Sequence, residues 1–541
     1  MTNSFKILSQ NKIFYEYFLS NKILEVKEEL SAEELLARII FLVKFSCRNH
    51  AGYYSDGRLE NILVDYGEKL NQYVDDKKVA RYIENLSIDN NSDTILHVAT
   101  KLYEAGGHTR IIYQFLKRCT SRKQILILTD QSINEVPQWF AVNNRDIPII
   151  TINKFTSMFE RAYLLRYISN LSKTVILHHH PYDAVPVIAF SHGKCPPVLL
   201  ENHAHSWFWL GPSIADIVLT LSNFHKDFTY KTRPVNNVHC FPFTQIDDLD
   251  ACFNQQDKLD AKARLKLNPR AICIISIGTA GKFIPNAQYN FYNTAKKIVS
   301  RFENAELFVI GIEDSTLIRS KYNLYSNRIH FVGTVSDPVD YYKAADICLD
   351  SLPQPSLGGT VYSTLIGMAC PVFKYGAVNM FYGLNLIDAK LYEQYIGNMK
   401  NEIEYLDKLE FLINNPEIRL SIAKEIREDY VRLYSKRILE DNINEMLALA
   451  NNKKHIFRKI PVGKFYCDAD SAEIAETSLF QDLPQVYAEF RSYLSFRDKI
   501  MILIRLFSAR VHCLDVLMLA KKHMENNLKK VYFVIIKNMQ S

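Results

Sequence analysis

The chain has 541 residues, of which 48% are hydrophobic and 23% charged, and these proportions predict a globular protein with an ample core. A net charge of +6 is small for this length and does not indicate a nucleic-acid-binding protein, which needs a strongly basic face. The ten cysteines form no CxxC pair, so we expect reduced thiols instead of a disulfide framework or a zinc knuckle.

The first 92 residues predict an all-α domain. Apolar residues recur at helical spacing from Glu28 to Lys44, after Ser31 as the N-cap and with Glu34 as its capping-box partner. The N-terminus lacks the apolar core and cleavage site of a secretory signal, and no window is apolar for about 18 residues. We therefore expect a cytoplasmic protein without a membrane span.

From Thr94 onwards, short apolar runs alternate with helical patterns. A first set includes TILHVA, QILILT, TVILH and PVLLEN, and a second set includes AICIISIG, ELFVIG, RIHFVG and CPVFKY. Such alternation predicts an α/β fold with parallel, doubly wound sheets. We expect two tandem Rossmann-like halves, 93–245 and 246–453, with ligands at the carboxyl ends of the strands and often between the domains.

The last segment, 454–541, predicts a helical extension. Its part from Phe496 to Lys537 is rich in Leu, Ile and Met, and basic residues outnumber acidic ones after Met501. One interpretation is a pair of helices that packs on the body of the protein or on a partner subunit. The other is a peripheral contact with the inner face of the membrane, because a basic amphipathic helix attracts anionic lipid.

Two glycine-rich segments carry a family resemblance. GGHTR, residues 106–110, follows the first strand, and SLGGT, residues 356–360, predicts a turn in the second half from which Thr360 opens the next helix. With the tandem halves, they resemble a GT-B glycosyltransferase. The segment ADICLDSLPQPSLGGTVYSTLIGMACPVF is similar to the donor segment of glycosyltransferase family 41, which holds the O-GlcNAc transferases and the bacterial adhesin N-glycosyltransferases.

The chain departs from its relatives at two positions. Thr364 stands near the point where O-GlcNAc transferases have an acidic residue, and Ser356 and Thr364 stand where retaining family 4 enzymes have paired glutamates. The exact family and the inverting or retaining outcome therefore stay open.

The donor site is expected in the second half. Lys282 follows a strand, where a fixed positive charge could neutralise the β-phosphate of a leaving UDP, and the family places a phosphate-binding Lys at a comparable point. Backbone N–H groups at a helix start favour an anion, and glycines let it approach. The predicted donor-binding residues are Gly278, Thr279, Lys282, Val335, Ser356, Gly358, Gly359 and Thr360.

The acceptor site is expected in the first half. His108 is the predicted catalytic base, because an imidazole can deprotonate an acceptor hydroxyl, and Asp183 is the second candidate. The predicted substrate-binding residues are Gly107, Arg110, His180 and His203, and the aromatic run 207–209 could stack on a sugar. No metal site is expected, since the three consecutive histidines 178–180 cannot all face one ion.

The resemblance implies a hexosyl- or N-acetylhexosaminyl-transferase that moves a sugar from a nucleotide-sugar, expected to be a UDP-sugar, to a protein or glycan acceptor. It implies no cofactor and no metal beyond this donor. Three alternatives stay open: a transferase for lipopolysaccharide or capsule-type glycans, a UDP-sugar 2-epimerase, and a non-catalytic partner of a glycosyltransferase.

Overall fold

The structure of the chain is a computed structural model. It describes residues 3–84, 93–104, 106–120, 122–242, 254–286, 288–335, 337–376, 390–397 and 399–477, with residues 497 and 501. The predicted helices after residue 496 lie outside these ranges except for those two residues. The chain divides into two compact units, of which the first comprises residues 1–59, 206–210 and 462–541 and the second comprises 60–205 and 211–461.

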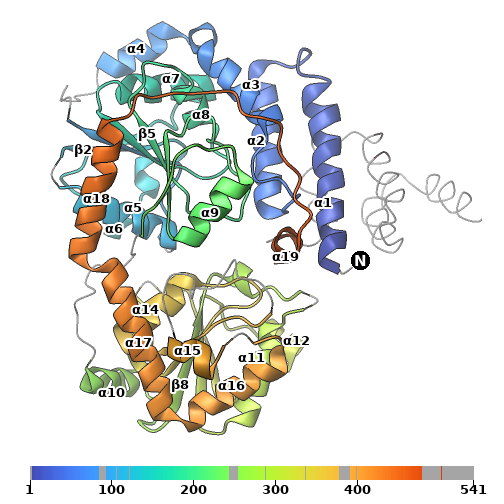
Figure 1. Cartoon of the computed structure of the whole chain (residues 1–541), viewed down its shortest axis with the longest axis vertical. Helices are drawn as coiled ribbons and strands as arrows, with labels where there is room; N and C mark the ends of the chain where they lie inside the picture. The colour runs from blue at the N-terminus through green and yellow to red at the C-terminus, as the bar shows by residue number, and fades with distance from the viewer. Residues whose placement is uncertain are drawn as a thin grey trace, which may run out of the picture. The chain divides into compact units, whose positions relative to one another are not determined.

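The first unit contains three packed helices. Helix α1 (Asn3–Leu19) packs against α2 (Ala32–Arg48) and against α19 (Ala469–Thr477), which returns from the other end of the sequence (Figure 1). Helix α2 begins with the predicted capping box, in which the Ser31 side chain accepts from the N–H of Glu34 and the Glu34 carboxylate accepts from the N–H of Ser31.

The aromatic run 207–209 belongs to this first unit. Phe208 is fully buried and Trp209 is 3% exposed, and the backbone N–H of Trp209 donates to the carbonyl of Tyr54 at 3.2 Å. Only Trp207, at 39% exposure, presents a ring to solvent. Sugar stacking by the whole run is therefore not supported, because burial commits two of the three rings to the core.

The second unit begins within α3 (Gly57–Glu68) and continues through α4 (Asp76–Glu84) into a sheet of seven parallel strands. The strand order is β3-β2-β1-β4-β5-β6-β7. The strands are β1 (Ile95–Ala99), β2 (Gln124–Leu128), β3 (Ile149–Thr151), β4 (Thr174–His178), β5 (Val198–Glu201), β6 (Ile217–Thr220) and β7 (Val238–Cys240). The helices that connect them are α5 (Gly107–Arg118), α6 (Gln138–Asn143), α7 (Met158–Ser169), α8 (Val185–Phe190) and α9 (Asn223–Thr232).

A second sheet in the same unit has five parallel strands in the order β10-β9-β8-β11-β12. The strands are β8 (Ile272–Ile277), β9 (Ala305–Ile310), β10 (Ile329–Gly333), β11 (Ile347–Leu349) and β12 (Cys370–Val372). The helices are α10 (Gln255–Arg264), α11 (Phe291–Arg301), α12 (Thr316–Tyr322), α13 (Val339–Ala344), α14 (Leu357–Gly367), α15 (Lys390–Tyr395), α16 (Glu402–Asn414) and α17 (Pro416–Tyr434). The two predicted Rossmann-like sheets are thus both present and wholly parallel.

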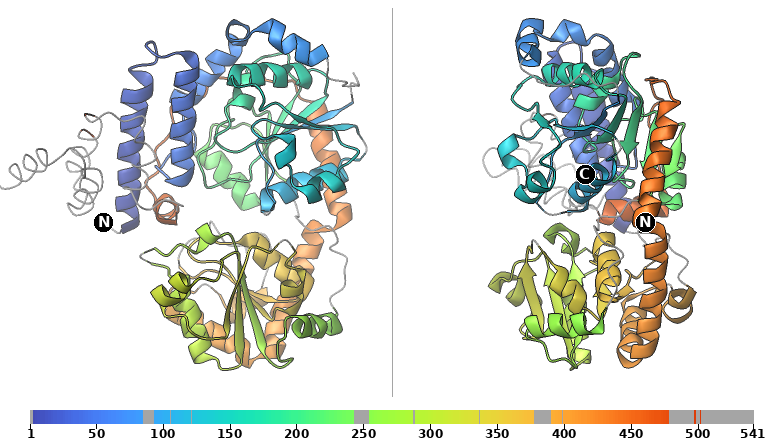
Figure 2. Two further views of the ribbon diagram at one scale, coloured as in Figure 1. Left: turned by 180° about the vertical axis from the view of Figure 1, so that it is seen from behind. Right: turned by 90° about the vertical axis from the view of Figure 1, so that its left-hand side faces the viewer.

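Helix α18 (Lys436–Asn451) follows α17 and packs on the first sheet (Figure 2). Its residues Ile443, Met446 and Leu447 join the core formed with Ile95 and Phe115. The chain then runs without regular structure through residues 453–467 before α19. Across the described ranges, no helix combines the length and the apolar character that a bilayer crossing requires.

The strand orders locate the ligand-binding edges. In an open parallel sheet, ligands bind at the carboxyl ends of the strands where the order reverses direction. This switch point lies between β1 and β4 in the first sheet and between β8 and β11 in the second.

Candidate functional site

Lys282 lies at the switch point of the second sheet. The chain leaves β8 through Gly278 and enters a short 3₁₀ helix, Ala280–Phe283, which carries Lys282. Its Nζ donates to the carbonyl of Pro355 at 2.7 Å, so the side chain reaches the loop that follows β11. Burial lowers the pKa of Lys282, and the nearby Asp350 opposes that shift.

Asp350 follows β11 and organises the same loop. Its Oδ1 accepts from the backbone N–H of Ser351 at 3.0 Å and from that of Ser356 at 2.6 Å. The side chain is almost fully buried, and this burial raises its pKa to about 6 while Lys282 and Lys374 lower it. Sequence reasoning noted Asp350 only as part of a family pattern. Its role could have been predicted from its position, because a carboxyl between a buried strand and a proline-containing loop can accept hydrogen bonds from the N–H groups of that loop.

The glycine pair lies inside the first turn of α14 and not before it. The helix begins at Leu357, whereas the sequence suggested that Thr360 opens it. The N–H groups of Gly359 and Thr360 both donate to the carbonyl of Ser356, at 2.9 and 3.3 Å. Ser356, the N-cap, makes no side-chain capping bond.

Gly359 has a packing role that the sequence did not reveal. A Cβ added at this position would lie 2.2 Å from Cγ2 of Ile277, at the end of β8. The missing side chain therefore lets α14 approach the strand closely. Thr360 is only 1% exposed, so its hydroxyl is not presented to solvent.

The other predicted donor residues are more dispersed. Gly278 is close to Lys282 and Ser351, because an added Cβ would lie 3.2 Å from Lys282 Cδ and 3.4 Å from Ser351 Oγ. Thr279 is exposed. Val335 is partly buried and follows β10, which is the edge strand of the sheet. The structure thus gathers most of the predicted donor set at β8 and β11 and leaves Val335 two strands away.

In the first sheet, His108 lies in the first turn of α5, which begins at Gly107. His108 Nε2 donates to the carbonyl of His178 at 2.7 Å, which leaves the neutral ring with its lone pair on Nδ1. That Nδ1 atom is buried and has no hydrogen-bond partner among the residues that the structure describes. Burial lowers the pKa of His108 to about 4, against the opposing influence of Glu201, so the ring is neutral at pH 7.

A series of hydrogen-bonded polar side chains joins four neighbouring strands, β2, β1, β4 and β5. Gln124 Nε2 donates to the carbonyl of Leu116 at 2.9 Å, so its Oε1 accepts from His97 Nε2 at 3.1 Å. His97 Nδ1 then accepts from His178 Nε2 at 3.1 Å, which leaves His178 Nδ1 to accept from Glu201 Oε2 at 3.0 Å. These directions follow from the partners of each group.

The proton between His178 and Glu201 belongs to the Glu201 carboxyl. Burial raises the pKa of Glu201 to about 7 and lowers that of His178 to about 3. Sequence reasoning missed the roles of His97 and Glu201. The available signal was a histidine inside each of two apolar strands, TILHVA and TVILH.

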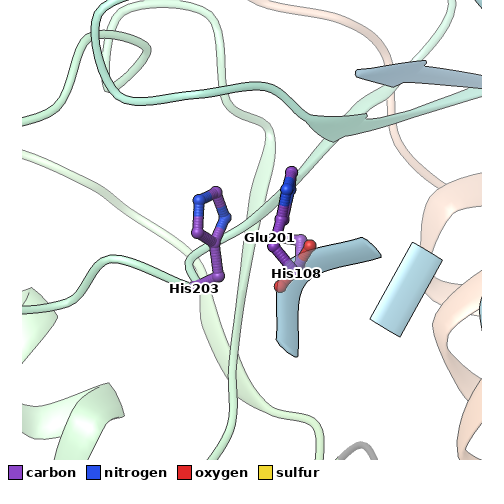
Figure 3. Close-up of side chains that lie close together, drawn as sticks. All are labelled: His108, Glu201 and His203. Carbon is purple, nitrogen blue, oxygen red and sulfur yellow. The ribbon is translucent and has the colours of Figure 1, made fainter. Parts of the chain in front are cut away.

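His203, two residues after Glu201, completes the group. Its ring lies against that of His108, with centroids 4.1 Å apart and planes inclined by 32° (Figure 3). His203 Nδ1 and Glu201 Oε1 are buried and, like His108 Nδ1, have no hydrogen-bond partner in the described part of the chain. His108, Glu201 and His203 each offer a ligand atom, and these atoms lie within 4.8 Å of one another.

Asp183 has little capacity for proton transfer in this structure. Its Oδ2 accepts from the hydroxyls of Thr100, at 2.8 Å, and of Thr129, and its Oδ1 accepts from the N–H of Val185 at 3.0 Å. The carboxylate thereby joins the ends of β1 and β2 to the start of α8. Because both oxygens are engaged and the side chain is buried, its contacts are those of a structural residue.

His180 and Arg110 flank the histidine group. His180 Nδ1 bonds the hydroxyl of Tyr182 at 2.9 Å, and its ring centroid is 5.3 Å from that of His108. The guanidinium carbon of Arg110 lies 4.0 Å from the ring centroid of Trp139, in a cation–π contact. The structure therefore brings His180 and His203 to His108 and stacks Arg110 on an aromatic ring.

Comparison with known proteins finds similarity only at the level of structure. No family model and no curated protein sequence matches the chain. A glycosyltransferase from Rickettsia africae matches with a TM-score of 0.52 and 13% identity, over 67% of this chain and 100% of its own. A TarM variant from S. aureus, in a complex that contains UDP, matches with a TM-score of 0.51 and 10% identity, over 67% and 100%.

HepE from Anabaena, in complex with UDP-glucose, matches with a TM-score of 0.51 and 11% identity, over 66% of this chain and 99% of its own. At such low sequence identity, these matches show a shared fold and not a shared activity. Two parallel Rossmann-like sheets, each with polar side chains at its switch point, agree with these matches. The chain has the GT-B fold of glycosyltransferases.

Proposed function

We propose that the protein is a glycosyltransferase that moves a sugar from a UDP-sugar to a protein or glycan acceptor. The observation that carries this proposal is the convergence of Lys282 and the start of α14 at the switch point between β8 and β11. A cation beside a helix N-terminus suits a diphosphate. The UDP and UDP-glucose complexes of the two structural neighbours support the choice of donor.

The expected reaction is attack by an acceptor nucleophile on the anomeric carbon of the donor. The bond from that carbon to the diphosphate oxygen breaks, and UDP leaves with the electron pair. Lys282 would stabilise the charge that develops on the β-phosphate. Its place in the loop is fixed by the hydrogen bond to Pro355, so it needs little reorganisation during the reaction.

His108 is the proposed acceptor-side base. No described residue donates a hydrogen bond to its Nδ1 lone pair, and its lowered pKa keeps the ring neutral and able to take the acceptor's proton. His180 and His203 lie beside it and are proposed to contact the acceptor. Asp183 is the weaker candidate, because its oxygens already accept three hydrogen bonds.

The resemblance of the donor segment to family 41 favours a protein acceptor, and this finer assignment is part of the proposal. The proposed place of action is the cytoplasm. A screen of UDP-sugars for UDP release, with and without fractions of cell lysate, tests the function. If no nucleotide-sugar binds, the proposal fails.

Lys282→Ala is expected to lower turnover about 100-fold or more while the fold survives, by analogy with the loss of one oxyanion donor. The matched control is Lys297→Ala, an exposed lysine of the same half that pairs with Glu402. Wild-type turnover in Lys282→Ala would contradict the assignment. Conversion of the UDP-sugar without any acceptor would indicate an epimerase, and binding without turnover a non-catalytic partner.

A further inference from the structure

We propose that His108, Glu201 and His203 form a binding site for a divalent transition-metal ion of the Zn²⁺ class, with a coordination position left open. Two imidazole nitrogens and one carboxylate oxygen are a ligand set that catalytic zinc sites use. The three ligand atoms lie within 4.8 Å of one another (Figure 3). This site is not part of the donor site at β8 and β11.

Each of the three side chains has a nitrogen or oxygen atom that is available to an ion. His108 Nδ1, Glu201 Oε1 and His203 Nδ1 are buried and lack a hydrogen-bond partner within the described residues. His108 Nδ1 must present a lone pair, because the Nε2–H of the same ring is committed to a carbonyl. Buried polar atoms without partners are costly, and a bound cation would satisfy all three.

His108 is held in a ligating orientation by a backbone carbonyl. In metal sites, a ligating histidine donates its other N–H to a carbonyl or carboxylate, and a ligating carboxylate is itself hydrogen-bonded. Here this support holds for His108, whose Nε2 donates to the carbonyl of His178 at 2.7 Å. Glu201 Oε2 donates to Nδ1 of the same residue at 3.0 Å, so the carboxyl releases its proton when it binds the ion. His97 and Gln124 fix the orientation of the His178 ring in turn.

The ligand set also selects the ion. Nitrogen and oxygen ligands without a thiolate suit Zn²⁺, Co²⁺ or Fe²⁺ better than Cu⁺, and imidazoles argue against Mg²⁺ and Ca²⁺. Ligands of a tetrahedral zinc lie about 3.3 Å apart, given metal–ligand bonds of about 2.0 Å. The ligand atoms, which spread over up to 4.8 Å, must therefore draw together on binding. His203, the ligand outside the regular elements, lies in the loop after β5 and is partly exposed.

Metal binding at His108, Glu201 and His203 can be measured without donor or acceptor, so it is testable whether or not the proposed function holds. A bound ion would occupy the same His108 lone pair that the proposed reaction uses. Proton transfer by His108 and metal binding are therefore alternative states of one site.

The test uses the full chain after removal of any affinity tag and dialysis against a chelator. Co²⁺ is added and visible absorption recorded. We expect saturable binding of one Co²⁺ per chain, with d–d bands, without a thiolate charge-transfer band, and with displacement by Zn²⁺. His203→Ala and the nearly isosteric Glu201→Gln are each expected to weaken binding about tenfold or more.

The matched control is His239→Ala, which removes another partly buried histidine of the same sheet and should bind Co²⁺ as the wild type does. Zn²⁺ should raise the Tm of the wild type and of His239→Ala but not that of His203→Ala, which also shows that the variants are folded. No saturable Co²⁺ binding, wild-type affinity in both ligand variants, or a thiolate band from a site at the exposed Cys467 would overturn the proposal. None of these outcomes affects UDP-sugar binding.

Discussion

Replacement of Asp350 tests how the donor loop is held. Asp350 Oδ1 accepts from the N–H groups of Ser351 and Ser356 at 3.0 and 2.6 Å, in a site that is 2% exposed. Asp350→Ala removes this acceptor and leaves two buried N–H groups without a partner. Each such group costs about 1–3 kcal/mol, so the expected loss is about 2–6 kcal/mol in free energy of unfolding. Asp350→Asn keeps an acceptor oxygen and is the matched control.

The measurement is urea-induced unfolding at pH 5, where the Asp350 carboxyl, with its pKa raised to about 6 by burial, is mostly neutral in the folded protein. At this pH the free energy of unfolding of the asparagine variant should differ from that of the wild type by about 1 kcal/mol or less, because its amide oxygen replaces the carboxyl oxygen. The alanine variant should also bind UDP more weakly, since its loop is released. If the alanine and asparagine variants unfold at the same urea concentration, the hydrogen bonds of Asp350 do not hold the loop.

The same group gives a pH dependence with a defined sign. A carboxyl with a raised folded-state pKa contributes stability below its unfolded pKa and loses it as the pH rises through the folded value. For Asp350 this stability is lost between about pH 3.8 and pH 6. This difference between the unfolded and folded pKa of Asp350 corresponds to about 3 kcal/mol in free energy of unfolding. Asp350→Asn has no carboxyl to titrate and should not lose this stability as the pH rises. Its free energy of unfolding relative to the wild type should therefore increase between pH 5 and pH 8.

Two further predictions concern packing and a second buried carboxyl. Gly359→Ala places a Cβ 2.2 Å from Ile277 Cγ2 and should lower the free energy of unfolding by about 1–3 kcal/mol. Gly193→Ala is the control and should cost little, because its Cβ meets nothing within 4 Å. Equal urea midpoints for the two variants would contradict this prediction. Burial raises the pKa of Glu60 to about 7, against hydrogen bonds from the N–H groups of Ser213 and Gly211. Glu60 should therefore contribute a decline in wild-type stability from about pH 4.5 to pH 7. Glu60→Gln should remove this contribution, and that of Asp350 should remain, in denaturant titrations at each pH.

Local patterns in the sequence determined the elements and the fold class. Apolar runs such as AICIISIG become buried strands because both faces of a parallel sheet are covered, and the Ser31–Glu34 box starts a helix because its bonds join residues three apart. The same patterns predicted two tandem sheets, and the GT-B fold is confirmed by the structural matches. The position of Lys282 at a strand end could also be predicted, since it depends only on the end of an apolar run.

Tertiary structure alone decided which strand ends are neighbours. The chain from Gln124 through His97 and His178 to Glu201 joins residues of four strands, and its members meet only because the sheet order places β1 between β2 and β4, with β5 next. Likewise, the closeness of Gly359 to Ile277 depends on how a helix packs on a strand that precedes it by about 80 residues. No local periodicity encodes such contacts, because they arise from burial of elements that lie far apart in the sequence. The sequence therefore determined what kind of fold forms, and the packing of its strands decided which polar groups share a site.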